Sequence, residues 1–326
     1  MARKKVLFVC GSMNQTTMMH KISKQLPDYD HAFTPFFCDG AYKGFQKLGW
    51  LDWTIVGGQN RRGTEAYFAA QKLPVDYAGS HGNYDLMLTC TDLIVPKRVL
   101  RQPLILVQEG MTDPENFMFH VVRYTHKVGV PRWLASTSTT GLSDAYTRFC
   151  VASDGYRRHF ERKGVKPEKL VVTGIPNFDN VQEYLDNDFP HKNYVLVATT
   201  DTRENFKWDN RKKFIQKARE IANGRLLIFK LHPNEAFERS AAEIEKYAPG
   251  SLVFQKGNTN HMIANCDVLI TQFSSVVYVG MALGKQVFSY FDMDELRELL
   301  PLQNGGASAS NIAGVARELL GDQIGH

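Results

Sequence analysis

The sequence predicts an α/β protein made of two doubly wound, Rossmann-like domains that face a central cleft. In both halves of the 326-residue chain, short apolar runs typical of strands in a buried parallel sheet alternate with helical stretches. A polar segment with one proline, residues 179–193, lies between the halves and suits a hinge. The predicted domains are residues 1–180 and 181–326, and the last helix is allowed to cross back to the first domain.

The first half begins with a continuous apolar strand over residues 5–10, which runs into a turn at Gly11. The elements expected after it are helix 18–26, strand 32–37, helix 64–73, strands 84–92 and 103–107, strand 149–153, helix 154–163 and strand 170–176. Gly164 is typical of a residue that ends a helix. Residues 120–143 show no clear period and suit either a surface loop or a flap over an acceptor or a membrane.

The alternation starts again in the second half. We expect strands 194–199, 225–231, 251–255, 268–270 and 287–291, and helices 210–222, 235–247, 259–266 and 309–320. One more helix should begin at Ser274 or Ser275, because hydroxyl side chains are favoured just before a helix. The free N–H groups of such a helix start also favour a phosphate.

Composition narrows the class of protein. The formal charge is +5 and the basic residues are scattered, which suits a small anionic substrate or an anionic membrane surface. No basic stripe interleaved with aromatic residues is present, so nucleic-acid binding is not favoured. The five cysteines are dispersed and form no Cys-x-x-Cys pair, which indicates free thiols in a reducing compartment. The first apolar run is too short for a signal peptide or a membrane span, so we expect a cytoplasmic protein.

Three acidic residues follow predicted strands of the first half. Asp92, Glu109 and Asp113 should therefore lie at the carboxyl edge of one sheet, where open α/β folds collect ligands. The Gly11 turn after the first strand belongs to the same edge. Each acid also suits an ordinary capping or turn-forming role.

Polar clusters follow four strands of the second half: Thr199–Arg203, Lys230–His232, Gln255–Gly257 and Gln272–Ser275. Together they offer cations, an imidazole, hydroxyls and free N–H groups, which suits a nucleotide diphosphate. The residues predicted to bind nucleotide or phosphate are Gly11, Thr200, Arg203, Lys230, His232, Ser274 and Ser275. No cluster of His, Asp and Glu with metal-ligand spacing is visible, so we expect neither a metal nor another cofactor.

The second half resembles the nucleotide-binding domain of GT-B glycosyltransferases. Lys230-Leu-His-Pro, Thr271-Gln-Phe-Ser-Ser275 and Phe288-Ser-Tyr-Phe-Asp292 are similar to segments of CDP-glycerol glycerophosphotransferases and of bacterial transferases with paired HP and S motifs. In those families the His and Ser positions, which match His232, Ser274 and Ser275 here, hold the phosphates of a cytidine-activated donor. Where the glycerophosphotransferases carry a catalytic His in a Trp-His-Gly segment, this chain has Gln108-Glu109-Gly110, and Glu109 is the substitute base.

A second resemblance is to the non-hydrolysing UDP-N-acetylglucosamine 2-epimerases, which also have the GT-B fold. It is carried by Val195–Phe206 and Val171–Pro176, and it implies Asp92 and Glu109 as acidic catalytic residues. The chain departs from that family where a His is replaced by Thr200 or Asp201. The family's Gly-Gly-x-Gln-Glu-Glu segment is replaced by Ser275–Gly280.

These features lead to one hypothesis and two alternatives. The hypothesis is an inverting, metal-independent transferase of cell-envelope or capsule polysaccharide assembly. It would use a CDP-, CMP- or UDP-linked donor and a carbohydrate or lipid-linked acceptor, with Glu109, or else Asp113, as general base. The alternatives are an epimerase that uses Asp92 and Glu109, and an inactive GT-B binding subunit.

Two further expectations concern partners. The basic and aromatic run from Arg123 through Lys127 and Arg132 to Trp133 suggests peripheral contact with the inner face of the membrane. An oligomer is compatible with the sequence, which does not indicate its size.

Overall fold

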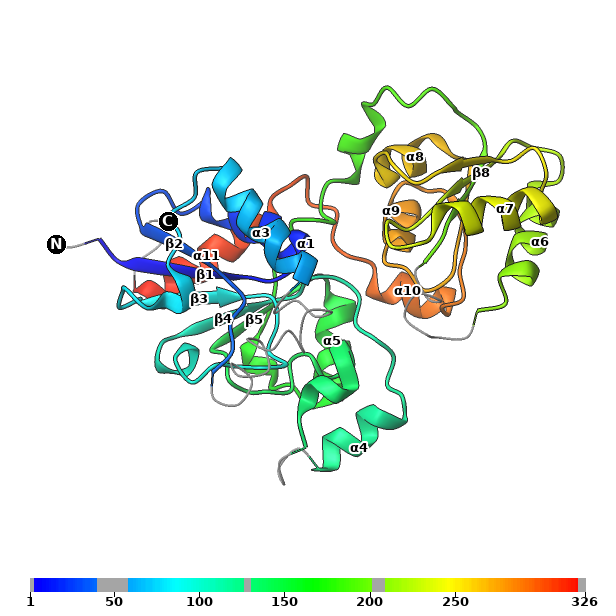
Figure 1. Ribbon diagram of the computed structural model, residues 1–326. Helices are drawn as coiled ribbons and strands as arrows, with labels where there is room; N and C mark the ends of the chain where they lie inside the picture. Colours follow the sequence, from blue (N-terminus) through cyan, green and yellow to red (C-terminus); the bar gives the residue numbers. More distant parts are fainter. Residues whose placement is uncertain (1–2, 40–57, 126–129, 201–208, 322–326) are drawn as a thin grey trace. The chain divides into compact units, whose positions relative to one another are not determined.

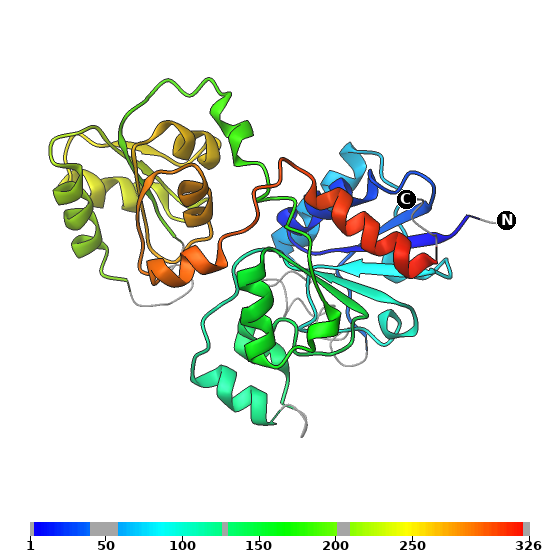
Figure 2. The ribbon, with the colours of Figure 1, turned by 180° about the vertical axis from the view of Figure 1, so that it is seen from behind.

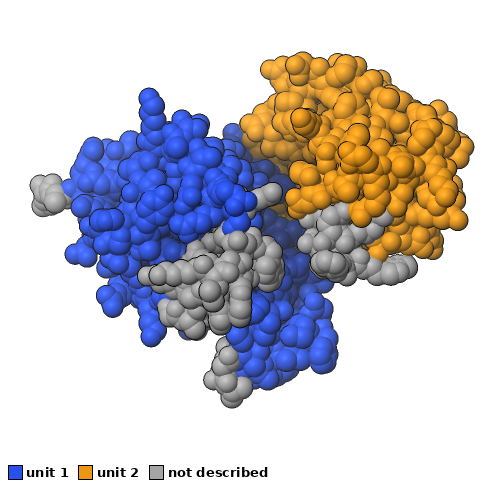
Figure 3. Space-filling model, in the orientation of Figure 1, with its two compact units in different colours: residues 1–179, 304–326 blue, residues 180–303 orange. Residues whose placement is uncertain are grey.

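The computed structural model describes residues 3–39, 58–125, 130–200 and 209–321 (Figure 1). The chain forms two compact units, residues 1–179 with 304–326 and residues 180–303 (Figure 3). The last helix, α11 (Ser308–Leu320), therefore belongs to the first unit, although most of the second half forms the second.

The first unit contains a six-stranded sheet in the order β2-β1-β3-β4-β5-β6, and every neighbouring pair is parallel. Its strands are β1 (Lys5–Cys10), β2 (Asp30–Pro35), β3 (Leu86–Thr89), β4 (Leu104–Val107), β5 (Arg148–Val151) and β6 (Leu170–Val172). From Val6 to Cys10 every residue of β1 is buried, which explains why this strand reads as an unbroken apolar run.

The described helices of the first unit are α1 (Met13–Ser23), α3 (Gly58–Ala70), α4 (Phe117–Thr125), α5 (Asp154–Lys163) and α11. The Ser12 and Ser153 hydroxyls cap α1 and α5 by accepting the N–H groups of Gln15 and Tyr156. α5 ends at Gly164, whose φ of 103° lies in the left-handed region. α11 packs against α1 and β3 (Figure 2).

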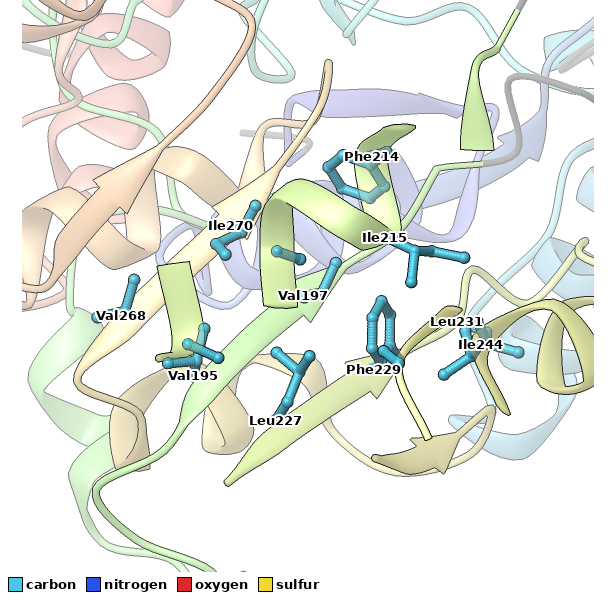
Figure 4. Packing of buried hydrophobic residues seen from close by; sticks show 13 residues of the cluster. Val195, Val197, Phe214, Ile215, Leu227, Phe229, Leu231, Ile244, Val268 and Ile270 are labelled. Carbon is cyan, nitrogen blue, oxygen red and sulfur yellow. The ribbon is translucent and has the colours of Figure 1, made fainter. Parts of the chain in front are cut away.

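The second unit contains a parallel five-stranded sheet in the order β11-β10-β7-β8-β9. Its strands are β7 (Val195–Ala198), β8 (Leu227–Lys230), β9 (Leu252–Phe254), β10 (Val268–Thr271) and β11 (Gln286–Phe288). Its described helices are α6 (Arg211–Ala222), α7 (Phe237–Tyr247), α8 (Thr259–Asn265), α9 (Val276–Ala282) and α10 (Met293–Leu299). Phe214 and Ile215 of α6 pack over the valine and isoleucine side chains of β7 and β10 (Figure 4).

Several predicted elements differ from the observed ones at their ends. α1 begins five residues before the expected 18–26 helix, because Ser12 is the capping residue. α3 likewise begins at Gly58 rather than at residue 64. The region expected to be irregular contains α4 and a short 3-10 segment, Arg132–Thr139. α10 was not predicted, although Asp292 caps it by accepting the N–H groups of Asp294 and Glu295.

None of the helices in the described part of the chain is both long and apolar enough to cross a membrane. Among the same residues, no group of three or more His, Cys, Asp and Glu side chains could hold a metal ion. The five cysteines are buried free thiols.

Candidate functional site

The second unit has a topological switch point between β7 and β10. From β7 the chain adds β8 and β9 on one side, and it then returns to place β10 and β11 on the other. Ligands of doubly wound sheets bind outside the carboxyl ends of the strands at such a point. Here the residues that follow the two strands are Thr199 and Thr200 after β7, and Gln272 after β10.

His232 follows β8 and is fixed to the end of β7. Its backbone N–H donates to Thr199 Oγ1 at 3.1 Å and to Glu235 Oε2 at 3.0 Å. Its Nδ1 accepts the backbone N–H of Asn234 at 3.3 Å. The neutral ring therefore carries its proton on Nε2, which makes Nε2 a hydrogen-bond donor.

A buried ionic network of Arg211, Asp209 and Glu235 stabilises this edge of the sheet. Glu235 Oε1 accepts from Arg211 Nη2 at 2.5 Å, and Arg211 Nε lies 3.1 Å from Asp209 Oδ2. Gln272 Nε2 donates to the other oxygen of Asp209 at 2.8 Å. Thr200 Oγ1 then donates to Gln272 Oε1 at 3.3 Å. The ends of β7, β8 and β10 are thus joined into one hydrogen-bonded rim, which favours a preorganised site.

Lys230 is the last residue of β8 and is 5% exposed. Its ammonium donates to the carbonyl oxygens of Leu231 at 3.0 Å and Gln255 at 2.9 Å. Burial lowers the pKa of Lys230, and the nearby Glu235 opposes this shift. In this position Lys230 holds the ends of β8 and β9 together through the backbone.

Ser274 and Ser275 lie between β10 and α9, and both are half-buried. Ser275 is the N-cap residue, but its side chain makes no capping hydrogen bond. Ser274 Oγ instead accepts the N–H of Val276 at 3.5 Å. Because Lys230 and Thr271 both pair with Ala198 of β7, the His232 and Ser274 segments start about 10 Å apart, two strand spacings. One nucleotide is long enough to reach both segments.

In the first unit, Glu109 lies beside the loop that follows β1. Its two carboxylate oxygens accept from Ser12 Oγ at 2.8 Å and from Gln15 Nε2 at 2.5 Å. The carbonyl oxygen of Gly11 accepts from Thr64 Oγ1 at 3.0 Å. Glu109 and Gly11 therefore share the carboxyl edge of the first sheet. Ser12 and Gln15 were not among the predicted site residues; the N-cap pattern after β1 could have indicated Ser12.

The other two predicted acids have different surroundings. Asp92 is fully buried, and its oxygens accept the backbone N–H groups of Gly141 and Ser143 at 3.0 Å. Arg132 lies 3.7 Å from the same carboxylate. Asp92 thus fixes the 141–143 turn and presents no exposed oxygen to a substrate. Asp113 is exposed and accepts from Thr137 Oγ1 at 2.8 Å.

Two predicted residues lie outside the described ranges. They are Arg203 of the nucleotide-binding set and Lys127 of the basic run. Neither protein-family models nor curated protein sequences match this chain.

Solved structures do match, over nearly the whole chain. S. aureus MnaA with UDP gives a TM-score of 0.63 at 11% identity, covering 99% of this chain and 98% of that one. The UDP-GlcNAc 2-epimerase of Neisseria meningitidis bound to UDP-GlcNAc gives 0.57 at 12% identity, covering 96% and 100%. The chain has the GT-B fold.

A further GT-B structure comes from the other group that the sequence resembles. A variant of the wall teichoic acid polymerase TagF matches with a TM-score of 0.51 at 13% identity, covering 99% of this chain and 90% of that one. The expected GT-B fold, with likeness to both groups, is thus confirmed. At these identities the likeness establishes the GT-B fold and leaves the activity open.

Proposed function

We propose that this protein is a GT-B enzyme that uses a nucleotide-activated donor, and that it transfers the activated sugar or polyol phosphate to a hydroxyl acceptor in cell-envelope or capsule polysaccharide assembly. The observation that supports this best is the hydrogen-bonded rim at the β7–β10 switch point. It places the His232 segment and the Ser274–Ser275 segment on the two strands that neighbour β7.

The donor phosphates are assigned to this rim. His232 Nε2–H and the hydroxyls of Ser274 and Ser275 would stabilise the charge that develops on the leaving phosphate. Fixed donors can do this without a metal ion. Thr200 would help through the rim, and Arg203 stays a predicted ligand. Lys230 would act on the phosphates only through the backbone that it holds, because its ammonium already donates to two carbonyls.

Glu109 is assigned as the general base that takes the proton of the acceptor hydroxyl. It is half-buried at the carboxyl edge of the first sheet, and Ser12 and Gln15 fix the orientation of its carboxylate. A positioned base contributes typically 10²–10⁴-fold to the rate. Glu109→Gln should therefore lower turnover by about that factor and leave donor binding unchanged.

The donor is tested by a thermal-shift screen against CMP, CDP, UDP, GDP and their sugar conjugates. A ligand that binds only the folded state raises its stability by RT ln(1 + [L]/Kd), so the preferred base gives the largest shift. His232→Ala and Ser274→Ala should remove the shift, whereas Lys217→Ala, an exposed change on α6, should keep it. No shift with any of these compounds contradicts the proposal.

An epimerase is the second candidate, because the two highest TM-scores above belong to MnaA and a 2-epimerase. The burial of Asp92 favours the transferase, because the epimerase hypothesis requires Asp92 as a second catalytic acid and a buried carboxylate cannot reach a substrate. Incubation with UDP-N-acetylglucosamine alone decides between them. Inversion at C2, followed by NMR, would establish the epimerase; no reaction without an acceptor is expected for the transferase.

Peripheral membrane contact is assigned to α4. Phe117 is 78% exposed and Tyr124 is 80% exposed, and the exposed Arg123 lies on the same helix. Near an anionic surface each basic side chain adds about 1 kcal/mol of attraction. Co-sedimentation with phosphatidylserine vesicles should weaken in Phe117→Ser and Arg123→Gln; sedimentation that ignores both changes would contradict this contact.

A further inference from the structure

A cavity of about 510 Å³ lies in the first unit, where α1 ends and β2 begins. Lys24, the residue that ends α1, forms part of its wall, as do Asp30, His31 and Phe33 of β2. Cavities of this size hold small-molecule ligands. Because β2 starts here, the cavity belongs to the amino edge of the first sheet, whereas the candidate catalytic residues lie at the carboxyl edge.

Two opposite charges at this cavity lack a partner within the described ranges. Lys24 and Asp30 are both exposed, and neither the ammonium nor the carboxylate forms a hydrogen bond or an ion pair there. The two groups also do not pair with each other. A ligand that satisfies both must therefore carry an anionic and a cationic group.

His31 adds a hydrogen-bond acceptor to the cavity wall. Its Nε2 is buried and has no hydrogen-bond partner in the described part of the chain. Burial lowers the pKa of His31, so the ring is neutral at pH 7, while a hydrogen bond with the Leu26 backbone and the charge of Asp30 oppose the shift. A backbone contact that raises the pKa is one in which the ring donates to a carbonyl, so Nδ1 carries the proton and Nε2 is an acceptor. An N–H group of a ligand would satisfy it.

Apolar residues complete the wall. Phe33, which is 1% exposed, lies there together with Pro27, Leu73 and Pro74. An apolar group placed against them is removed from water, which favours binding. The carbonyl end of α1 is the negative end of the helix dipole, so a cation is favoured beside it.

These features favour one class of ligand. A phosphate could pair with Lys24 but would be repelled by Asp30, and an uncharged sugar would leave both charges unmatched. A metal ion is not favoured, because no group of three or more His, Cys, Asp and Glu side chains among the described residues could hold one. A zwitterion with an apolar side chain matches both charges, the acceptor and the apolar wall.

We infer that this cavity binds a free α-amino acid with an apolar side chain. The ammonium group of the ligand pairs with Asp30 and His31, its carboxylate pairs with Lys24, and its side chain packs against the apolar wall. The inference goes beyond the proposed function and does not depend on it, because the cavity lies at the opposite end of α1 from Ser12, the contact of Glu109.

The test compares L-phenylalanine with two derivatives that each lack one charge, by calorimetry or ligand-observed NMR on the full chain. L-phenylalaninamide has no carboxylate, and N-acetyl-L-phenylalanine has no ammonium group. Lys24→Met and Asp30→Asn remove the matching charges of the protein, and both positions are exposed, so the fold should be kept. Asp28→Asn, a nearby exposed change outside the cavity wall, is the matched control.

The wild-type protein should bind L-phenylalanine about tenfold more tightly than either derivative, and glycine should bind more weakly because it has no side chain. Lys24→Met should remove the preference over the amide, and Asp30→Asn should remove the preference over the N-acetyl compound. Asp28→Asn should keep both preferences. Absence of binding, or a preference that survives in its matching variant, overturns the inference. Inorganic phosphate that competes as well as the amino acid would show an anion site and would overturn it too.

Discussion

Two buried lysines show how different the same side chain can be within one chain. Lys230 is 5% exposed, and backbone carbonyls accept hydrogen bonds from its ammonium. Lys163, the last residue of α5, is 2% exposed, and its ammonium has no hydrogen-bond partner among the described residues. That ammonium lies 5.3 Å from the ring centroid of Phe119 and 5.7 Å from that of Phe160. Burial lowers its pKa to about 8, against the attraction of Glu115, Asp92 and Asp113.

Replacement of this charge should stabilise the protein. Because the pKa of Lys163 is lowered on folding, the unfolded chain binds more protons between pH 8 and 10.5, and stability rises with pH across that window. Lys163→Met should therefore stabilise by about 3 kcal/mol at pH 7, and the gain should vanish near pH 10.5. Urea unfolding at several pH values measures this. Arg158→Met, an exposed change on the same helix, should show no such pH dependence.

Removal of the Arg211 charge, in contrast to that of Lys163, should destabilise the protein, because Arg211 is paired with Glu235. Glu235 is 3% exposed and Arg211 is 6% exposed, so loss of one partner leaves an uncompensated buried charge. Arg211→Met should cost about 3 kcal/mol, and the double change with Glu235→Leu should recover only part of it, because the buried Asp209 carboxylate is still left without its cation. A double-mutant cycle by urea unfolding measures the coupling. Additive losses would show that the pair is not coupled.

At this scale the sequence indicates which residue types gather at the site but not what each side chain contacts. His232 and Gln272 follow their strands as expected, because the end of a strand is encoded locally. The burial of Asp92 and the carbonyl partners of Lys230 depend on segments distant in sequence or on side-chain direction. The contact of Ser12 with Glu109 spans 97 residues, and no local pattern reports it.

α5 was predictable because both of its ends carry capping residues, whereas the caps of α1 and α10 were not used to place those helices. α5 has the expected bounds because Ser153 begins it and Gly164 ends it. α4 was missed because Phe117, Met118 and Tyr124 expose apolar side chains, which obscures the usual helical period. α10 is short, and most of its stability comes from packing that the sequence does not display.

The junction between β6 and α11 gives a test of element packing. Gly174 has a φ of 73°, and a Cβ atom there would overlap Ser308 Oγ and lie 2.9 Å from Asn304 Nδ2. Gly174→Ala should therefore cost about 3 kcal/mol. Gly164→Ala is the matched control: its φ is 103°, but nothing lies within 4 Å of the new Cβ, so only the backbone cost of about 1 kcal/mol remains. Thermal unfolding compares the two variants, and equal losses would contradict the packing.

At the scale of the whole molecule the sequence indicated the fold class, a division near residue 180 and a last helix that is allowed to cross back to the first domain. Two βα-alternating halves predict two sheets, and two parallel sheets are observed. The assignment of α11 to the first unit depends on long-range contacts. Ser308 N donates to Asp179 Oδ2 at 2.9 Å, and Asn304 N donates to Asp179 O at 3.0 Å.

Removal of residues 304–326 should damage only the first unit. It deletes the fully buried Ile312 and Ala316 of α11, whose packing against α1 would be lost. The shortened chain should keep hydrogen-exchange protection in β7, β8 and β10 and lose it in β1 and β3. Equal loss of protection in both sheets would show that the units fold as one.

The chain leaves the first unit after Asp179 and returns to it at Asn304, so the second unit is inserted into the first. Its two ends lie together, because Val181 N donates to Gln303 Oε1 at 3.1 Å. In the first unit, the two chain segments that flank the insert are also joined, since the N–H groups of Asn304 and Gly305 donate to the carbonyl oxygen of Asp179. Residues 180–303 thus form an inserted unit whose first and last residues lie next to each other. Exchange of residues 180–303 for another unit of the same kind would therefore leave every strand of the first sheet in place.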